Sequence, residues 1–130
     1  MSSQLSKDNQ KYSQKYQREI ALGTVLQFLY YQKFFLPLYL STYFRQVLGN
    51  LIENYHKYNQ GVWEIIYRSD YFVMNYMERA LLLLLYCEIK ASQIPEKVLV
   101  HVYIRLAKKY CRKNFEKLIP VFISYAKKNH

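Results

Sequence analysis

The segment from Leu81 to Tyr86 restricts the fold of this chain more than any other part of the sequence. Every residue in it is apolar or aromatic, and the apolar run extends from Ala80 to Cys87. A helix that is apolar around its whole circumference must be covered by other elements on several sides. The run is far shorter than the roughly 20 residues that a bilayer span needs. We therefore expect a helix over residues 76–90 at the centre of a helical bundle.

The composition favours one all-α domain that covers residues 1–130. Hydrophobic residues make up 52% of the 130 residues, and only three glycines and three prolines are present, which disfavours a turn-rich β fold. The N-terminus has no apolar segment of the kind found in signal peptides. Cys87 and Cys111 lie in apolar patterns without a CxxC motif, so we expect buried, reduced thiols and a cytoplasmic protein. We expect no membrane partner, because the basic helix described below buries its apolar face in the core.

Positive charge is concentrated at the two ends of the chain. The formal net charge is +10. Residues 34–104 carry six basic and six acidic side chains, whereas residues 105–130 carry eight basic and one acidic, and residues 1–33 carry five basic and two acidic. This asymmetry indicates a polyanionic partner, and both nucleic acid and an anionic membrane surface have the required charge.

The clearest basic surface is predicted on a helix that starts at Pro95, a residue favoured in the first turn. One face of this helix is apolar. The opposite face carries Lys97, His101, Arg105, Lys108 and Arg112, with Lys109 beside them. Within this helix no acidic residue lies four positions away to balance the row, and adjacent like charges cost a helix a few tenths of a kcal/mol per pair. We favour a polyanion-binding face over a merely solvated one.

A second basic surface is predicted near the N-terminus. A helix from about Asp8 to Lys33 buries an apolar stripe in its second half, and its first half extends beyond the core. Its basic residues share the azimuth of that stripe: Lys7, Lys11, Lys15 and Arg18. Residues 1–14 are thus either a basic RNA-binding extension or a frayed, solvated tail.

The remaining helices are predicted from apolar periodicity and from helix breakers. A helix is expected over residues 38–58, followed by a break at Asn59 to Gly61 and a short helix near residues 62–67. Ser69 and Asp70 offer an N-cap for a helical piece that starts near Tyr71. The last helix, near residues 114–128, contains Pro120 and should kink or begin late.

No enzymatic site is predicted. The carboxylates are scattered, there is no glycine-rich phosphate loop, and the three histidines are too dispersed for a metal site. We therefore expect a non-enzyme without cofactor or metal. The 15 tyrosines could stack on RNA bases, but an AT-rich genome would also raise their number, and we favour that second explanation.

Several motifs, in a consistent order, resemble the NusB family. They are Arg18-Glu19-Ile20-Ala21, Phe44 followed by Leu48, Glu78-Arg79-Ala80-Leu81 followed by Glu88, Ile94-Pro95-Glu96-Lys97-Val98, and Leu106-Ala107-Lys108. The pattern departs from the family at several positions, including Leu83, Cys87, His101 and Arg105, and its N-terminal segment has lysines where the family has arginines. Lysine attracts phosphate but lacks the bidentate recognition that arginine provides.

The resemblance implies an all-α fold of about six to seven helices in two packed subdomains. It also implies a factor for transcription antitermination or rRNA processing that binds boxA-like single-stranded RNA together with the NusE ribosomal protein. The rRNA cytosine methyltransferases carry a similar domain, but we expect this chain to be too short for their catalytic part. The alternative is a diverged NusB-fold module for protein–protein interaction that does not bind RNA.

Overall fold

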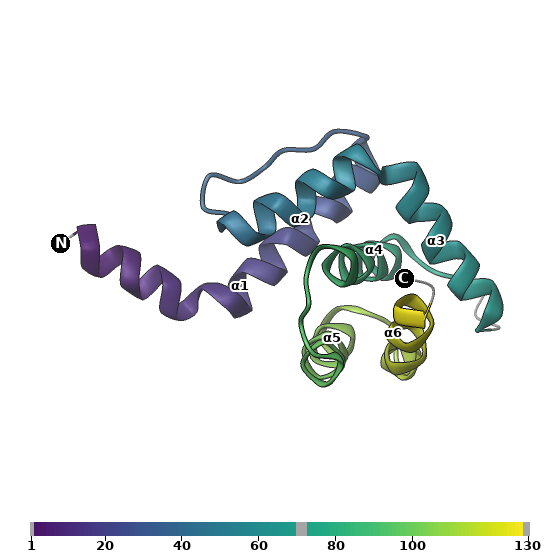
Figure 1. Ribbon diagram of the computed structural model, residues 1–130. Helices are drawn as coiled ribbons and strands as arrows, with labels where there is room; N and C mark the ends of the chain where they lie inside the picture. The colour runs from purple at the N-terminus through teal and green to yellow at the C-terminus, as the bar shows by residue number, and fades with distance from the viewer. Residues whose placement is uncertain (1, 70–72, 129–130) are drawn as a thin grey trace.

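The described residues of the chain form helices joined by loops. The computed structural model describes the backbone of residues 2–69 and 73–128, and side chains from residue 16 onward within these ranges. Those ranges contain no β-strand and no helix long and apolar enough to cross a bilayer. The elements, shown in Figure 1, are α1 (Ser2–Tyr31), α2 (Thr42–Glu53), α3 (Tyr55–Arg68), α4 (Tyr76–Ala91), α5 (Glu96–Tyr110), a 3₁₀ turn (Phe115–Lys117) and α6 (Leu118–Lys128).

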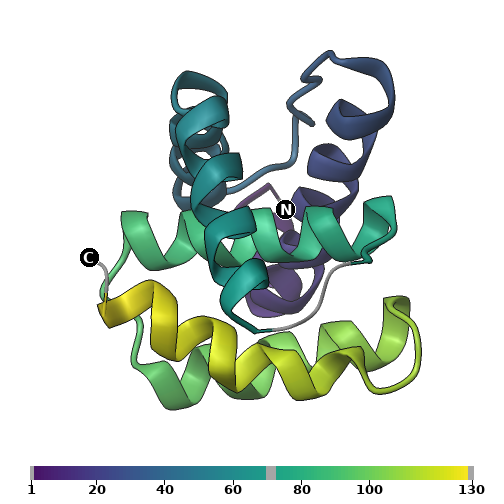
Figure 2. The same cartoon turned by 90° about the vertical axis from the view of Figure 1, so that its right-hand side faces the viewer.

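Helix α4 lies at the centre of the bundle, as its apolar sequence predicts. Figure 2 shows α1 and α2 on one side of α4, α5 and α6 on the other, and α3 crossing it. The five leucines from Leu81 to Leu85 are at most 1% exposed. The buried apolar side chains of all six helices form one cluster. The two halves of the fold therefore share a single core, which is built around α4.

Helix α4 begins at Tyr76, the start predicted for the central helix, whereas the helical piece predicted to start near Tyr71 falls partly outside the described residues. Ser69 follows the end of α3, where its hydroxyl donates to the Ile65 carbonyl at 2.9 Å, and Asp70 lies outside the described residues. The cap is Asn75, whose side chain accepts from the Glu78 N–H at 2.8 Å, while the Glu78 side chain accepts from the Asn75 N–H at 3.1 Å. This reciprocal pair satisfies two N–H groups that a helix start leaves without partners.

The predicted break at Asn59 to Gly61 is wrong. The chain breaks at Asn54, between α2 and α3, and Gly61 lies within α3. A Cβ atom built on Gly61 would lie 2.5 Å from the Tyr86 hydroxyl of α4. Glycine at this position therefore permits close packing of α3 against α4, which a sequence pattern cannot distinguish from a turn.

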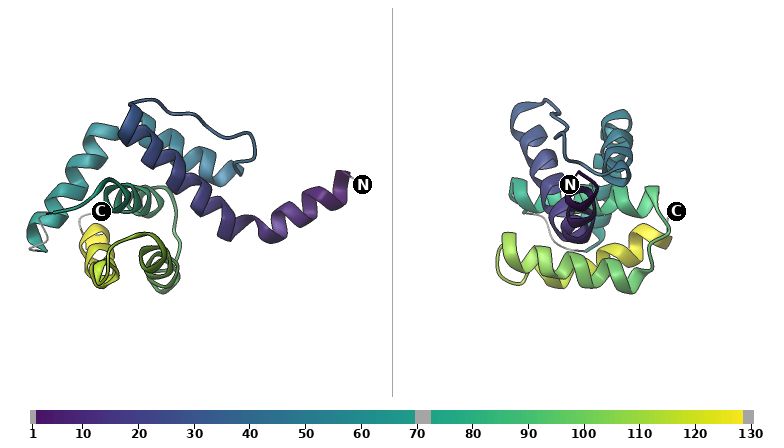
Figure 3. Two further views of the ribbon diagram at one scale, coloured as in Figure 1. Left: turned by 180° about the vertical axis from the view of Figure 1, so that it is seen from behind. Right: turned by 90° about the vertical axis from the view of Figure 1, so that its left-hand side faces the viewer.

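Helix α1 begins at Ser2, earlier than the predicted start near Asp8. Figures 1 and 3 show its first half projecting away from the bundle, as predicted. We call residues 2–16 the projecting half of α1. The buried face of α1 begins at Gln17, which is 9% exposed, and continues through Ala21 and Leu22.

Both predictions about proline are confirmed near the C-terminus. Pro95 directly precedes α5, and Pro120 lies in the first turn of α6. The chain after α5 turns through Asn114, whose φ of 76° is left-handed, and a 3₁₀ turn delays the start of α6. Pro120 is tolerated because its missing N–H would lack an intrahelical partner in the first turn.

Candidate nucleic-acid interface

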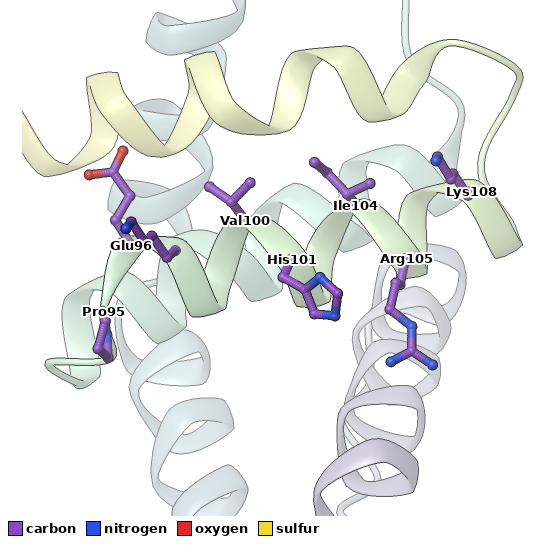
Figure 4. A pocket seen from close by; sticks show the side chains of 8 residues that line it. Pro95, Glu96, Val100, His101, Ile104, Arg105 and Lys108 are labelled. Carbon is purple, nitrogen blue, oxygen red and sulfur yellow. The ribbon is translucent and has the colours of Figure 1, made fainter.

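The outer surface of α5 presents cations to solvent. Lys97, His101, Arg105 and Lys108 are exposed, and we call these four residues the basic face of α5. They border an open groove of about 800 Å³ that is lined by residues of α5 and by Pro95, which precedes it. In Figure 4, Val100 and Ile104 point toward α6, whereas His101 and Arg105 point away from it. The groove thus combines an apolar floor with a cationic rim.

The basic face of α5 has no acidic partner among the residues that the structure describes. None of the described ion pairs involves its four members. Glu96 is the only acidic residue on the wall of the groove, and it lies at the N-terminal end of α5. Arg105 and Lys108 lie three residues apart and Lys97 lies on the same face of α5, so this surface carries unbalanced positive charge.

Lys109 differs from these residues because it has a partner on another helix. Its ammonium lies 2.6 Å from Oε1 of Glu19 on α1. The hydrogen bond from Lys109 to Glu19 is the main reason that the pKa of Lys109 lies above its ordinary value. This contact links the C-terminal half of α5 to α1, at a position three residues after the projecting half of α1.

Arg112 lies beyond the end of α5 and is paired as well. Its guanidinium donates to both carboxylate oxygens of Glu78, at 2.6 Å and 3.0 Å, and its backbone N–H donates to the same carboxylate at 3.1 Å. The Glu78 side chain is fully buried, whereas that of Arg112 is half exposed. Lys109 and Arg112 are therefore balanced by acidic residues of other helices, which spacing along α5 does not reveal.

Arg112→Ala should destabilise the fold at neutral pH by about 1–3 kcal/mol, because it removes the guanidinium donors of a buried carboxylate. Burial by itself would raise the pKa of Glu78, but hydrogen bonds from Arg112 and Asn75 hold it below its ordinary value of 4.5. A lowered pKa contributes stability that is present above the unfolded value and lost as the pH falls through the folded value. Urea unfolding should therefore show a smaller effect of Arg112→Ala at pH 3 than at pH 7. An equal effect at both values would contradict this role.

Arg18 faces the core rather than solvent. Its Nε and Nη2 atoms donate to the Glu88 carboxylate at 2.9 and 2.8 Å, and the Arg18 side chain is only 11% exposed. The hydroxyls of Tyr43, at 2.8 Å, and of Tyr103 donate to the same carboxylate. We call these four residues the Glu88 cluster. They join α1, α2, α4 and α5, and Glu88 is fully buried.

The charges of the Glu88 cluster stabilise one another. Burial alone would lower the pKa of Arg18, but the hydrogen bond and charge of Glu88 outweigh it and raise that pKa. Burial and the Glu88 charge raise the pKa of the Tyr103 hydroxyl, which stays protonated as a donor. The RNA-contacting role predicted for Arg18 stays a prediction, and its guanidinium is bound to a buried carboxylate.

Comparison with known families decides what kind of protein this is. The profile of the NusB family matches residues 3–119. The chain belongs to the NusB family. Searches of curated proteins and of solved structures give no significant match. NusB proteins generally bind RNA in antitermination and are generally not enzymes, although NusB domains also occur in RNA methyltransferases.

Family membership gives the motif residues a structural meaning. The arginine of the NusB-like Arg18-to-Ala21 motif and the glutamate at position 88 form the buried pair of the Glu88 cluster. Sequence reasoning missed this pairing, although one signal was available. Glu88 is a single carboxylate near the end of the most apolar helix, and a buried carboxylate requires a charged or hydrogen-bonding partner.

The N-terminal lysines of this NusB-family chain are only partly located. The backbone of α1 carries Lys7, Lys11 and Lys15 on its projecting half, but their side chains lie outside the described residues.

The described part of the chain contains no group of three or more His, Cys, Asp or Glu side chains arranged to hold a metal ion.

Proposed function

We propose that this chain binds single-stranded, boxA-like RNA as a factor of transcription antitermination or rRNA processing, with the NusE ribosomal protein as its partner. The observation that supports this proposal best is the basic face of α5. It is exposed, and the described residues offer it no acidic partner, whereas Lys109 and Arg112 are neutralised by tertiary contacts. Phosphates of RNA are the counterions that fit such a surface.

The proposed RNA surface differs from the one predicted from sequence. It keeps Lys97, His101, Arg105 and Lys108, and it extends toward Lys7, Lys11 and Lys15 on α1. It excludes Arg18 and Arg112, whose guanidinium groups bind buried carboxylates. Lys109 contacts α1 through Glu19, and this pairing leaves the Lys109 side chain half exposed. Because the cations are mostly lysines, we expect attraction to the RNA backbone more than recognition of particular bases.

Reversing three charges of the basic face tests this proposal. The variant Lys97→Glu, Arg105→Glu and Lys108→Glu should weaken binding of a single-stranded RNA at least tenfold at moderate salt. The slope of log K against log salt should become shallower by about 0.7 for each phosphate that the variant no longer neutralises. Fluorescence anisotropy with a labelled boxA-like oligonucleotide at several salt concentrations measures both quantities.

A control variant separates the basic face from net charge. Lys33→Glu, Lys57→Glu and Arg68→Glu change the net charge by the same amount on exposed side chains away from α5. This control should retain most of the affinity. Equal losses of affinity in the two variants would show that only overall charge matters. If the unmodified protein binds no RNA at any salt concentration, the interaction-module alternative replaces the proposal.

A further inference from the structure

The loop between α1 and α2 holds two large side chains out into solvent. Leu38 is 85% exposed and Tyr39 is 80% exposed, at a turn closed by a hydrogen bond of 3.3 Å from the Leu40 N–H to the Pro37 carbonyl. Among the described side chains, no ring stacks on Tyr39. Contiguous exposed apolar patches, rather than single exposed apolar residues, mark interaction surfaces.

The backbone of this turn is fastened by side chains from two helices. Gln17 of α1 donates from its amide to the Tyr39 carbonyl at 2.7 Å and accepts from the Ser41 N–H at 2.7 Å. Arg45 of α2 donates to the carbonyls of Pro37, Leu38 and Leu40 at 3.2, 3.0 and 3.0 Å. The Tyr39 ring is therefore exposed, whereas its backbone is fixed by hydrogen bonds. Little backbone conformational entropy remains to be lost when the ring binds a ligand.

The turn lies where the projecting half of α1 leaves the bundle. Gln17, which contacts Tyr39, is the first residue after that half. The Arg45 side chain is exposed, and its guanidinium lies beneath the turn, with no acidic partner among the described residues. Tyr39 thus lies beside Arg45. It also lies close to the point where the projecting half of α1, which carries Lys7, Lys11 and Lys15, joins the bundle.

We propose that Tyr39 is a base-stacking residue for single-stranded RNA, and this inference rests on the proposed RNA-binding function. An exposed aromatic ring next to cations is the arrangement by which proteins hold unpaired nucleotides, since the ring stacks on a base while the cations attract the phosphates. A lipid surface or an apolar protein pocket would use Leu38 as well as Tyr39, and neither requires an aromatic ring. The turn also lies at the base of the basic half of α1, which favours a polyanion.

Substitutions at Tyr39 test the proposal by anisotropy with a labelled single-stranded RNA. Tyr39→Ala should weaken binding by about fivefold to a hundredfold, the range found when stacking aromatic residues are truncated. Tyr39→Phe should bind nearly as tightly as the unmodified protein, because stacking needs the ring and not the hydroxyl. The slope of log K against log salt should stay unchanged in both variants, since the cations that neutralise the phosphates are all retained.

Two controls distinguish base stacking from the loss of any exposed aromatic side chain. Tyr31→Ala removes a tyrosine that is 68% exposed at the opposite end of α1, and it should leave affinity unchanged. An RNA of the same length with abasic sites should bind the unmodified protein and Tyr39→Ala equally, because the phosphates remain and the bases are gone. Thermal melting should show Tyr39→Ala within a degree or two of the unmodified protein, as for other exposed positions.

The outcomes distinguish this inference from the function on which it rests. If the unmodified protein binds the RNA and Tyr39→Ala binds it as tightly, the stacking proposal is overturned and the RNA-binding function stands. A loss of affinity that Tyr39→Phe shares also overturns it, since the loss would then come from the missing hydroxyl and not from stacking by the ring. If the unmodified protein binds no RNA, both proposals fail, and binding of the turn to anionic vesicles would assign it to a lipid surface instead.

Discussion

Replacing Arg18 by alanine is expected to lower the free energy of unfolding by about 3–5 kcal/mol, because it leaves the fully buried Glu88 carboxylate without its cation. Single domains are typically stable by only about 5–15 kcal/mol, so this reduction is a large share of the total. Urea unfolding in the absence of RNA measures it directly. The hydroxyls of Tyr43 and Tyr103 remain as donors, but they carry no positive charge to offset the carboxylate.

Two further variants keep this prediction testable if Arg18→Ala fails to fold. Arg18→Lys keeps the charge but loses the bidentate geometry, so its stability should lie between those of the unmodified protein and the alanine variant. Arg105→Ala removes an exposed arginine and should change stability by less than about 0.5 kcal/mol. If Arg18→Ala melted within a degree or two of the unmodified protein, the Glu88 cluster would not be structural and Arg18 would return to the candidate RNA surface.

Replacing Leu84 by alanine should cost about 2–5 kcal/mol, because truncating its fully buried side chain leaves a cavity at the centre of the bundle. The size of the effect depends on how far the surrounding helices relax into that space. Helix α4 is packed on several sides, so we expect little relaxation and a value toward the upper end. Thermal melting and urea unfolding both measure the change.

A matched control for Leu84 lies on α5. Val98 is 46% exposed, and Val98→Ala should change stability by less than about 0.5 kcal/mol. If Leu84→Ala cost no more than this control, the central position of α4 would be contradicted. Both variants should leave the affinity for single-stranded RNA unchanged when they are folded, because neither alters the basic face of α5.

Apolar periodicity and residue type predicted the features that depend only on residues close together in the sequence. The apolar circumference of residues 81–86 requires a central helix, because no helix of that composition can face water. Pro95 and Pro120 mark helix starts because proline is tolerated where an N–H lacks an intrahelical partner. The exposed row at Lys97, His101, Arg105 and Lys108 follows from helical periodicity together with the apolar stripe opposite it.

Tertiary structure alone decided which charged residues are free for a partner. Arg18, Lys109 and Arg112 have the same charge as the basic face of α5, but each meets a carboxylate from a helix distant in sequence. Gly61 likewise marks a close helix crossing rather than a turn, because only the packed fold brings Tyr86 against it. Sequence periodicity determines which face of a helix a residue occupies, whereas the partner that it meets there depends on how the helices pack.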